Sequence, residues 1–342
     1  MGQLIKLNTR TKDFNFYINT LHKLCEKDLS IVNSIILEKL DSNVPLIHKI
    51  ASHLILSGGK RLRPLLTSCC YELCINNNRN ENKHLGLAAA VEFIHAATLL
   101  HDDVVDESKT RRGSLSANEL WGNKTSVLVG DFLFSRAFQL MAKYGNMEIL
   151  KLLSDTSVII SEGEILELSN DKNPKINENV YFEVINGKTA SLFSAACQVG
   201  AMSAKTTQEK IDAIKSFGTN FGMAFQLIDD AIDYYSSSNI LGKNVGDDFK
   251  QGKITLPLIL AYLRSNNEEK KFWKKTIENL HQEKDDLTRA IHIIKKYNCV
   301  EDTLETAKHF GNIAIDSLGI FENNKYKEIL INIITSSLTR LS

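Results

Sequence analysis

The sequence predicts an all-α protein, a single large helical bundle around a central cavity, and three observations support this fold class. Only four prolines occur among the 342 residues. Apolar residues recur at intervals of three and four over long segments, as on one face of an α-helix, and no sustained alternation of the strand type is present. The polar breaks between these segments are short, which favours helices packed side by side around one core.

Five segments are predicted to form helices of four or more turns, which is long for a globular protein. They span residues 85–105, 126–143, 149–168, 179–201 and 208–234. Polar breaks at 76–83, 171–178, 236–253 and 265–271 separate the helical segments, and none is long enough to link two domains. Residues 1–342 should therefore form one domain, with a motif-bearing core at about 45–263 and C-terminal helices at 264–342.

The composition is that of an ordinary globular protein with a substantial core, because 43% of the residues are apolar and 24% are charged. Basic and acidic residues number 41 each, so no global field attracts nucleic acid. The six cysteines form no Cys-x-x-Cys pair and are expected to be buried, reduced thiols. The N-terminus lacks an apolar signal core, and no segment reaches the roughly 20 apolar residues of a spanning helix. We expect a cytoplasmic protein without a transmembrane segment.

Two rows of three aspartates share one spacing and are the main chemical signal: Asp102, Asp103 and Asp106, then Asp229, Asp230 and Asp233. On a helix the first and last members of each row lie one turn apart on the same face. Such close carboxylates repel one another unless a cation neutralises them, and oxygen ligands without His or Cys suit Mg²⁺. One such row could be a solvated helix face, but both rows end strongly apolar helices. The pair predicts a diphosphate held through magnesium and a reaction that releases pyrophosphate.

Basic residues beside glycines form a second constellation, in the segments 58–64 (Gly-Gly-Lys-Arg-Leu-Arg-Pro) and 111–113 (Arg-Arg-Gly). Flexible backbone beside paired Lys and Arg suits a phosphate, since Arg offers bidentate hydrogen bonds and Lys a point charge. Lys188 with Thr189, and Lys243 and Lys253, offer further donors. A single basic pair is more often a surface feature. Their joint occurrence with two acidic rows indicates a diphosphate site.

These motifs resemble those of the trans-type polyprenyl diphosphate synthase family, in particular its long-chain, octaprenyl-type members that make the side chain of ubiquinone or menaquinone. The resemblance runs from about residue 57 to residue 260. Besides the basic motif and the aspartate rows, it includes Val-Gly-Asp-Phe at 129–132, Gly-Lys-Thr at 187–189 and Phe-Gln-Leu-Ile before Asp229. One departure is Ile254, where the family motif Gly-Lys-Pro-Thr has proline. This change affects loop stiffness rather than charge.

The resemblance implies a role for each motif residue. The isopentenyl diphosphate site would comprise Gly59, Lys60, Arg63, His95 and Arg112. The allylic diphosphate would meet Arg111, Lys188, Thr189, Gln226, Lys243 and Lys253. Asp102, Asp106 and Asp229 would be the principal ligands of three Mg²⁺ ions that bridge to diphosphate; Asp103, Asp230 and Asp233 would support them, and Lys188 and Lys243 would complete the catalytic group. The family also implies the isoprenoid synthase type of helical bundle and a homodimer.

The implied reaction is the head-to-tail addition of isopentenyl diphosphate units to an allylic diphosphate, for which we expect farnesyl diphosphate. Ala97 and Thr98 lie about 6 to 7.5 Å below Asp102 along a helix, and their small size favours a long product tunnel. Phe132, Phe134 and Phe138 are candidate floors of this tunnel, with core packing as the alternative role. We predict an octaprenyl (C40) product or one of similar length, released through transient contact with a membrane.

The sequence leaves several alternative functions to be weighed. A terpene cyclase or a head-to-head condensing enzyme would ionise a prenyl diphosphate in the same way, but it would not need the second diphosphate pocket that segment 58–64 indicates. A non-catalytic subunit of a heteromeric synthase would typically have degraded aspartate rows. A di-iron carboxylate bundle would use Glu-x-x-His motifs, which occur at Glu92 and at Glu81. His101 either orients the first aspartate row or simply packs on the surface.

Overall fold

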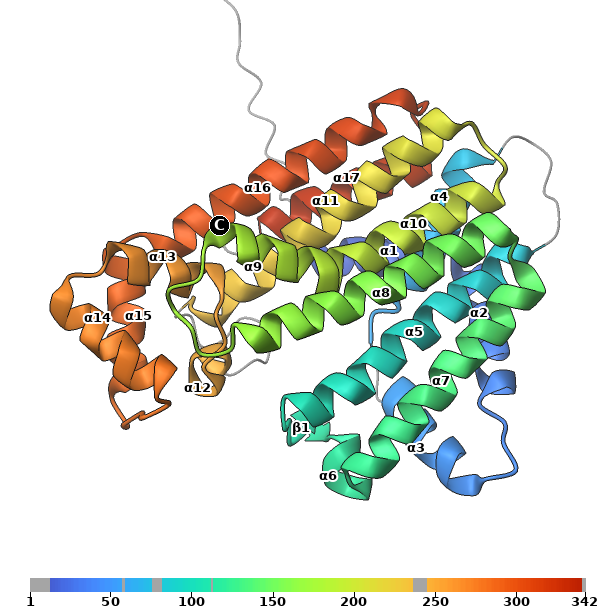
Figure 1. Ribbon diagram of the computed structural model, residues 1–342. Helices are drawn as coiled ribbons and strands as arrows, with labels where there is room; N and C mark the ends of the chain where they lie inside the picture. Colours follow the sequence, from blue (N-terminus) through green and yellow to red (C-terminus); the bar gives the residue numbers. More distant parts are fainter. Residues whose placement is uncertain (1–12, 57–58, 76–81, 112, 236–244, 340–342) are drawn as a thin grey trace, which may run out of the picture.

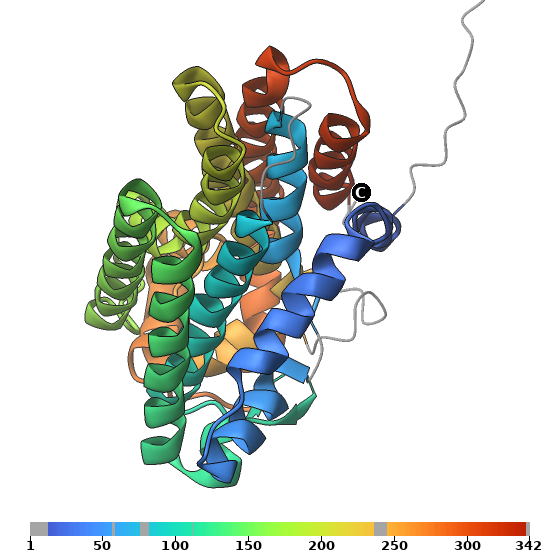
Figure 2. The same cartoon turned by 90° about the vertical axis from the view of Figure 1, so that its right-hand side faces the viewer.

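The computed structural model describes residues 13–56, 59–75, 82–111, 113–235 and 245–339, and this part of the chain is almost wholly helical. Its only strands are β1 (Thr110–Arg111) and β2 (Ser114–Leu115), a two-residue antiparallel pair with Thr110 opposite Leu115. Long helices lie side by side along most of the molecule, and shorter helices extend from one end of them (Figures 1 and 2). The predicted all-α, isoprenoid synthase type of fold is confirmed.

The helices of the first half are α1 (Phe14–Leu24), α2 (Glu26–Lys39), α3 (Pro45–Leu56), α4 (Leu62–Cys74), α5 (Lys83–Val105), α6 (Ala117–Trp121), α7 (Asn123–Tyr144) and α8 (Met147–Ser169). Those of the second half are α9 (Glu178–Ile185), α10 (Ser191–Ser203), α11 (Gln208–Asp233), α12 (Asp247–Gln251), α13 (Leu256–Arg264), α14 (Asn267–Trp273), α15 (Asp286–Lys296), α16 (Cys299–Ser317) and α17 (Lys325–Leu338). Two π-helical turns, Asn186–Ala190 and Lys274–Glu278, and the short 3₁₀ helix Leu318–Ile320 continue α9, α14 and α16.

The five predicted long helices are present, and one of them contains an irregularity. The segment predicted at 179–201 consists of α9 and α10 joined by the π-helical turn Asn186–Ala190, hereafter the π-turn. Periodicity alone does not reveal such a turn, because one wide turn hardly changes the apolar pattern. π-Helical turns inside α-helices are often found at functional sites.

Two predicted breaks contain helix that the sequence pattern did not indicate. Within 236–253, α12 begins where the Asp233 carboxylate accepts hydrogen bonds from the backbone nitrogens of Asp247 and Asp248. This cap comes from a distant residue, so local sequence gives no sign of it. Within 265–271, α14 begins with a capping box in which the Asn266 side chain and the Glu269 side chain each accept from the other residue's backbone.

Buried apolar side chains form three clusters that together join the long helices. The first cluster surrounds α5 and takes residues from α2, α3, α7 and α8. The second lies between α9, α11 and the helices α13 to α16, and the third joins α1, α4, α10, α11 and α17. All six cysteines are buried and free, as predicted. Among the described residues, no helix combines the length and the hydropathy needed to cross a bilayer.

Candidate active site

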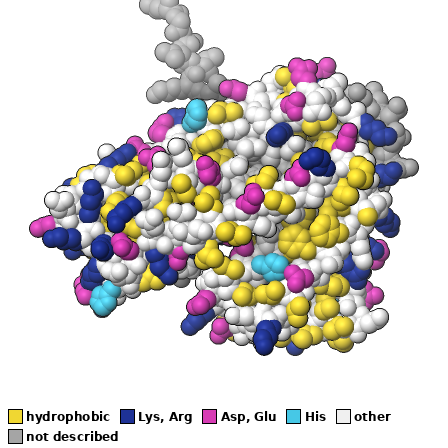
Figure 3. All heavy atoms as spheres, viewed as in Figure 1, with side chains coloured by type: hydrophobic (Ala, Val, Ile, Leu, Met, Phe, Trp, Pro, Cys, Tyr) yellow, Lys and Arg dark blue, Asp and Glu magenta, His cyan; other side chains and the backbone are white. Residues whose placement is uncertain are grey.

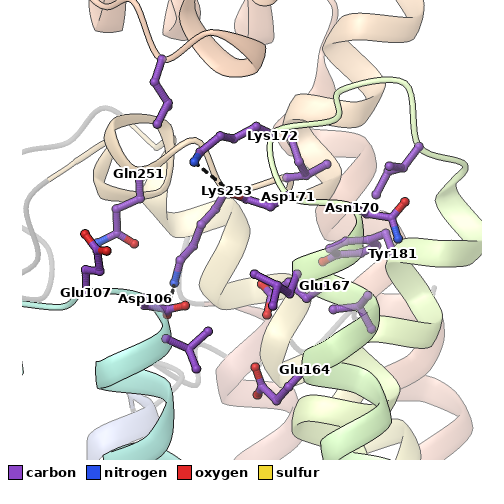
Figure 4. A pocket seen from close by; sticks show the side chains of 16 residues that line it. Asp106, Glu107, Glu164, Glu167, Asn170, Asp171, Lys172, Tyr181, Gln251 and Lys253 are labelled. Carbon is purple, nitrogen blue, oxygen red and sulfur yellow. Dashed lines mark hydrogen bonds and ion pairs between the residues drawn. The ribbon is translucent and has the colours of Figure 1, made fainter. Parts of the chain in front are cut away.

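The two aspartate rows lie at the C-terminal ends of α5 and α11, and Asp106 of the first row lines a cavity of about 370 Å³. In Figure 4, Asp106 enters this cavity from the end of α5, Glu164 and Glu167 from α8, and Lys253 reaches down from the opposite side. A second cavity of about 160 Å³ adjoins it and is lined by Asp229, Lys188 and Thr189. Glu167, Tyr181 and Lys253 line both cavities, so the two spaces form one continuous site.

The middle aspartate of each row and the last aspartate of the second row are held by hydrogen bonds from the protein. Arg111 donates from Nε to both carboxylate oxygens of Asp103, at 2.8 and 2.9 Å, and only 1% of the Asp103 side chain is exposed. Asp230 accepts from the Tyr181 hydroxyl at 2.6 Å and from Gln226 Nε2 at 2.7 Å. Asp233 caps α12, as described above. Asp230 also lines the smaller cavity, whereas Asp103 and Asp233 line neither of the two.

The other three aspartates, Asp102, Asp106 and Asp229, are the ones predicted as principal metal ligands. Burial, and then the charge of Glu164, raise the pKa of Asp102 to about 7, although Lys188 opposes the shift. Burial likewise raises the pKa of Asp230, in the second row, to about 7. Raised carboxyl pKa values report an excess of negative charge in a poorly solvated place. A hard dication would relieve that excess, so the donor set fits Mg²⁺.

The carboxylates do not form a closed cage. Among the described residues, no three Asp, Glu, His or Cys side chains converge closely enough to hold an ion by themselves. Mg²⁺ usually keeps water and shares phosphate oxygens instead of filling its coordination shell with protein ligands. Asp106 lines the larger cavity and Asp229 the smaller one, an arrangement that suits an ion that a diphosphate helps to bind.

Two of the predicted lysines stand inside the site, and each is paired with carboxylates. Lys253 Nζ lies 3.2 Å from Asp106 Oδ2, a contact that crosses the cavity in Figure 4. Lys188 Nζ lies 2.9 Å from Glu164 Oε2 and 2.6 Å from Glu167 Oε2. Thr189 donates to Gln226, which continues the chain of hydrogen bonds to Asp230. The structure thus brings Lys188, Thr189, Gln226 and Lys253 together around the two aspartate rows.

The basic motif occupies the turn before α4 and its first residues. Gly59 has a φ of 148°, which favours glycine, and Lys60 Nζ lies 4.6 Å from the centre of the Phe14 ring. The Arg63 guanidinium stacks 4.3 Å above Phe193, and burial lowers its pKa to about 10. His95 lies on α5, which packs against α4. Two predicted residues, Arg112 and Lys243, lie outside the described residues.

Arg61, which belongs to the basic segment 58–64 but was not among the predicted substrate-binding residues, holds this turn in place. Its φ of 44° is unusual for a residue with a side chain. Its Nη1 lies 2.5 Å from Glu92 Oε1, and its Nη2 donates to the Ile55 carbonyl at 2.7 Å. Glu92 is therefore engaged in an ion pair with Arg61, which argues against its use as an iron ligand in a di-iron site. The second Glu-x-x-His motif begins at Glu81, outside the described residues.

Comparison with known protein families matches residues 44–294 to the one described as polyprenyl synthetase. The chain belongs to this family. The chain is 38% identical to the octaprenyl diphosphate synthase of Haemophilus influenzae over 94% of its own length and 97% of that protein. Its identity to an all-trans-nonaprenyl-diphosphate synthase of Rhodobacter capsulatus is 36%, over 92% and 95% of the two chains.

Solved structures of polyprenyl synthetases have the same fold. A polyprenyl synthase from Caulobacter crescentus, complexed with calcium and isoprenyl diphosphate, superposes with a TM-score of 0.89 at 43% identity, over 95% of this chain and 98% of that one. A decaprenyl diphosphate synthase from Rhodobacter capsulatus gives a TM-score of 0.90 at 41% identity, over 95% and 99% of the two chains.

The residues predicted to set product length lie on α5 and α7 of this polyprenyl synthetase. Ala97 is fully buried in the first core cluster, and the Thr98 hydroxyl donates to the His95 carbonyl. Phe132 is partly buried with Arg136 4.8 Å from its ring centre, whereas Phe138 is 48% exposed. None of these side chains lines either of the two cavities described above. Their role in product length stays a prediction.

His101 does not orient the first aspartate row. Its Nε2 lies 3.1 Å from the Val127 carbonyl and 3.5 Å from Asp131, so the ring packs against α7. The sequence analysis also missed Glu164, Glu167, Tyr181 and Asp248, which line the site. The one available signal was the Glu-x-x-Glu spacing, which places two carboxylates on one face of a helix, but ordinary surface helices show the same spacing.

Proposed function

We propose that this polyprenyl synthetase is a long-chain trans-polyprenyl diphosphate synthase. It condenses isopentenyl diphosphate head-to-tail onto an allylic diphosphate, farnesyl diphosphate being the expected primer, and releases pyrophosphate. The observation that carries the proposal is the pair of adjoining cavities, of which one is lined by Asp106, the other by Asp229 and Lys188, and both by Lys253. Asp102 lies close enough for its charge to interact with those of Asp106 and Lys188. The names of the octaprenyl, nonaprenyl and decaprenyl relatives support a long product of about the octaprenyl (C40) length. The expected use is a quinone side chain.

Mg²⁺ bound by Asp102, Asp106 and Asp229 would stabilise the negative charge that develops on departing pyrophosphate. Lys188 and Lys253 both line the smaller cavity, where their ammonium groups would meet the same diphosphate oxygens and stabilise their charge. Arg111 and Tyr181 hold the second aspartate of each row and so fix the ends of α5 and α11. Cleavage of the allylic C–O bond releases pyrophosphate and leaves an allylic cation. The isopentenyl double bond attacks this cation, and the released pyrophosphate accepts the proton whose loss forms the new double bond.

One assay tests this function. The protein is incubated with Mg²⁺, farnesyl diphosphate and labelled isopentenyl diphosphate, and the labelled products are sized. We expect a product of about C40 that fails to form when the metal is chelated. A protein that incorporates no label would refute the synthase assignment, and a product that stops at C15 or C20 would refute only the long-chain part. A cyclase or a head-to-head enzyme would consume the allylic diphosphate without incorporating the label.

We also propose that two copies of the chain form a homodimer through α7 and α8. Large apolar side chains are exposed on these helices, and hydrophobic side chains gather over them in Figure 3. They include Val127 (37% exposed), Leu128 (67%), Phe138 (48%), Val158 (57%) and Ile159 (41%). Contiguous apolar surface of this kind marks a protein or membrane contact. A second copy is the proposed occupant. Cytoplasmic location and a brief membrane contact during product release belong to the same proposal.

A further inference from the structure

Two glycines bring α8 into direct backbone contact with the π-turn. A methyl group on Gly163 would lie 2.9 Å from the Lys188 backbone nitrogen, and one on Gly187 would lie 2.9 Å from the Gly163 Cα. Real side chains do not approach this closely, so the contact requires glycine on both sides. The close approach has a direct consequence. Each glycine is followed by a charged residue, Glu164 on α8 and Lys188 in the π-turn. The close approach of the two backbones brings these side chains together at the edge of the site.

Lys188 is held there by two carboxylates one helical turn apart. Glu164 and Glu167 accept from its Nζ at 2.9 and 2.6 Å, and all three side chains are at least partly buried, with exposures of 23%, 38% and 24% for Glu164, Glu167 and Lys188. A lysine side chain loses much rotamer freedom when it is fixed. One carboxylate would be enough to neutralise the ammonium group of Lys188, and the second carboxylate fixes the direction in which the lysine side chain points.

Lys253 shows what an ammonium does in this cavity without such a pair. Its Nζ makes an ion pair with Asp106, a predicted metal ligand, at 3.2 Å. Lys188 is also close enough to Asp102 for their charges to interact, and Asp102 is the other predicted ligand of the first row. An unrestrained Lys188 would therefore be expected to turn to Asp102 and compete with a cation for it.

We propose that Glu164 and Glu167, placed by the contact between Gly163 and Gly187, are positioning residues that hold Lys188 away from Asp102. Asp102 then stays available to a metal ion, while the ammonium stays directed at the space where a diphosphate is bound. Neither glutamate needs to touch the substrate. The catalytic consequence rests on the proposed synthase function, but the effect on metal binding does not.

The decisive measurement is a cycle of variants titrated with Mn²⁺ alone and followed by electron paramagnetic resonance. In the double variant Glu164→Gln, Glu167→Gln, Lys188 is free to pair with Asp102, so Mn²⁺ should bind more weakly. Lys188→Met should then strengthen binding by about tenfold more in that background than in the wild-type protein. The control is Glu162→Gln, which removes a charge from the exposed side of α8. An equal effect of Lys188→Met in both backgrounds would overturn the proposal.

Turnover gives a second, separate readout. The double variant should lose about 10- to 100-fold in kcat, with an unchanged KM for isopentenyl diphosphate, because only the allylic half of the site is disturbed. If the wild-type chain shows no elongation, the synthase assignment fails, yet the Mn²⁺ cycle still decides the role of the glutamates. A normal kcat in the double variant would show that the three charges serve stability alone.

The glycine contact has its own test. Gly163→Ala should displace the π-turn and lower Mn²⁺ affinity in the same direction as the double Gln variant. Gly319→Ala is the matched control, since nothing lies within 4 Å of the added methyl group. Circular dichroism and the thermal midpoint confirm folding of both. A folded Gly163→Ala protein that binds Mn²⁺ normally would remove the glycine contact from the mechanism.

Discussion

Arg111 and Asp103 form a multiply bonded ion pair that fastens the hairpin after α5 to the end of that helix. Besides the two contacts of Nε, Nη2 lies 2.7 Å from Oδ1. Because Arg111 is the second residue of β1, the pair fixes where the basic segment 111–113 begins. The middle aspartate of the row is thereby a structural partner of Arg111, whereas Asp106 pairs with Lys253 and lines the larger cavity.

Asp103→Asn should therefore mainly reduce stability, whereas Asp102→Asn should mainly reduce activity. Loss of the Asp103 charge leaves Arg111 without its partner and should lower the free energy of unfolding by about 2 kcal/mol, with a moderate loss of activity. Asp102→Asn should leave stability unchanged or raised, because a buried charge is removed, and should reduce kcat by at least about 100-fold. Urea unfolding and steady-state kinetics on both variants check this. Equal loss of stability in the two variants would contradict the assignment.

The ion pair of Lys253 with Asp106 predicts opposite effects on metal and substrate. Lys253→Met removes a competing cation, so Mn²⁺ should bind the ligand-free protein more tightly. The same variant loses a contact to the allylic diphosphate, whose KM should rise by about tenfold. Lys250→Met is the control, since Lys250 pairs with Asp247 on the exposed side of α12. If the variant binds Mn²⁺ more tightly but its KM for the allylic diphosphate does not rise, Lys253 does not face the diphosphate.

Ala97→Tyr should shorten the product without abolishing turnover. Ala97 is fully buried, so the larger side chain should also cost about 1–3 kcal/mol of stability through overpacking. Thr98→Tyr, at the next and partly buried position, provides a comparison with a smaller packing cost. Products are sized by chromatography after the thermal midpoint has shown that each variant is folded. A folded variant with unchanged product length would show that this face of α5 does not line the tunnel.

The proposed homodimer predicts that Leu128→Glu yields a monomer. Leu128 is 67% exposed in the single chain, so the substitution costs little within one copy, but it would bury a charge in the interface. Light scattering coupled to gel filtration measures the mass of the variant and of the wild-type protein. Leu263→Glu, at a 54% exposed position on α13, should leave the mass unchanged. A wild-type protein that elutes as a monomer would refute the dimer directly.

Glu269 predicts a pH-dependent contribution to the stability of the C-terminal region. Burial acts to raise its pKa, but hydrogen bonds from Lys296, the Asn266 backbone and Tyr297 outweigh it and lower the pKa to about 2. Because the folded pKa lies below the unfolded value near 4.5, the contribution is present above pH 4.5 and is lost as the pH falls toward 2.

Glu269→Gln should therefore be less stable than the wild-type protein at neutral pH by about 1 to 2 kcal/mol. The difference should shrink below the unfolded pKa of the carboxyl group. Glu268→Gln, the exposed neighbour on the same helix turn, should show no such trend. Denaturant unfolding at several pH values between neutrality and the acid limit is the measurement. A difference that does not depend on pH would show that the hydrogen bonds matter and the charge does not.

The sequence predicted the parts of the molecule that depend on local pattern. The apolar repeat of three and four located the long helices, and the spacing of Asp102 to Asp106 and Asp229 to Asp233 located both carboxylate rows. That the whole chain is one domain stays a prediction. Pattern could not reveal how each aspartate is held, because Asp103, Asp230 and Asp233 make hydrogen bonds with groups from other segments of the chain.

The ion pairs of Lys188 with Glu164 and Glu167 could not be predicted from the sequence for the same reason. Glu164 precedes it in the chain by 24 residues, and the two meet only because α8 crosses the π-turn at glycine. The C-terminal third carried no readable motif, yet Leu280 from this part lines the larger cavity. A sequence motif can identify reactive residues, but it cannot identify the apolar residues that line a cavity, since any apolar side chain of suitable size can take that place.

Leu280 adopts a φ of 46° and packs against Gly252, beside Lys253. Every aspartate and lysine assigned to the chemistry precedes it in the chain. During synthesis on the ribosome, the nascent polypeptide therefore contains all the charged groups of the active site before it contains the residue that finishes the rim. The full lining of the larger cavity therefore has to await the emergence of residue 280, which follows every reactive group in the chain.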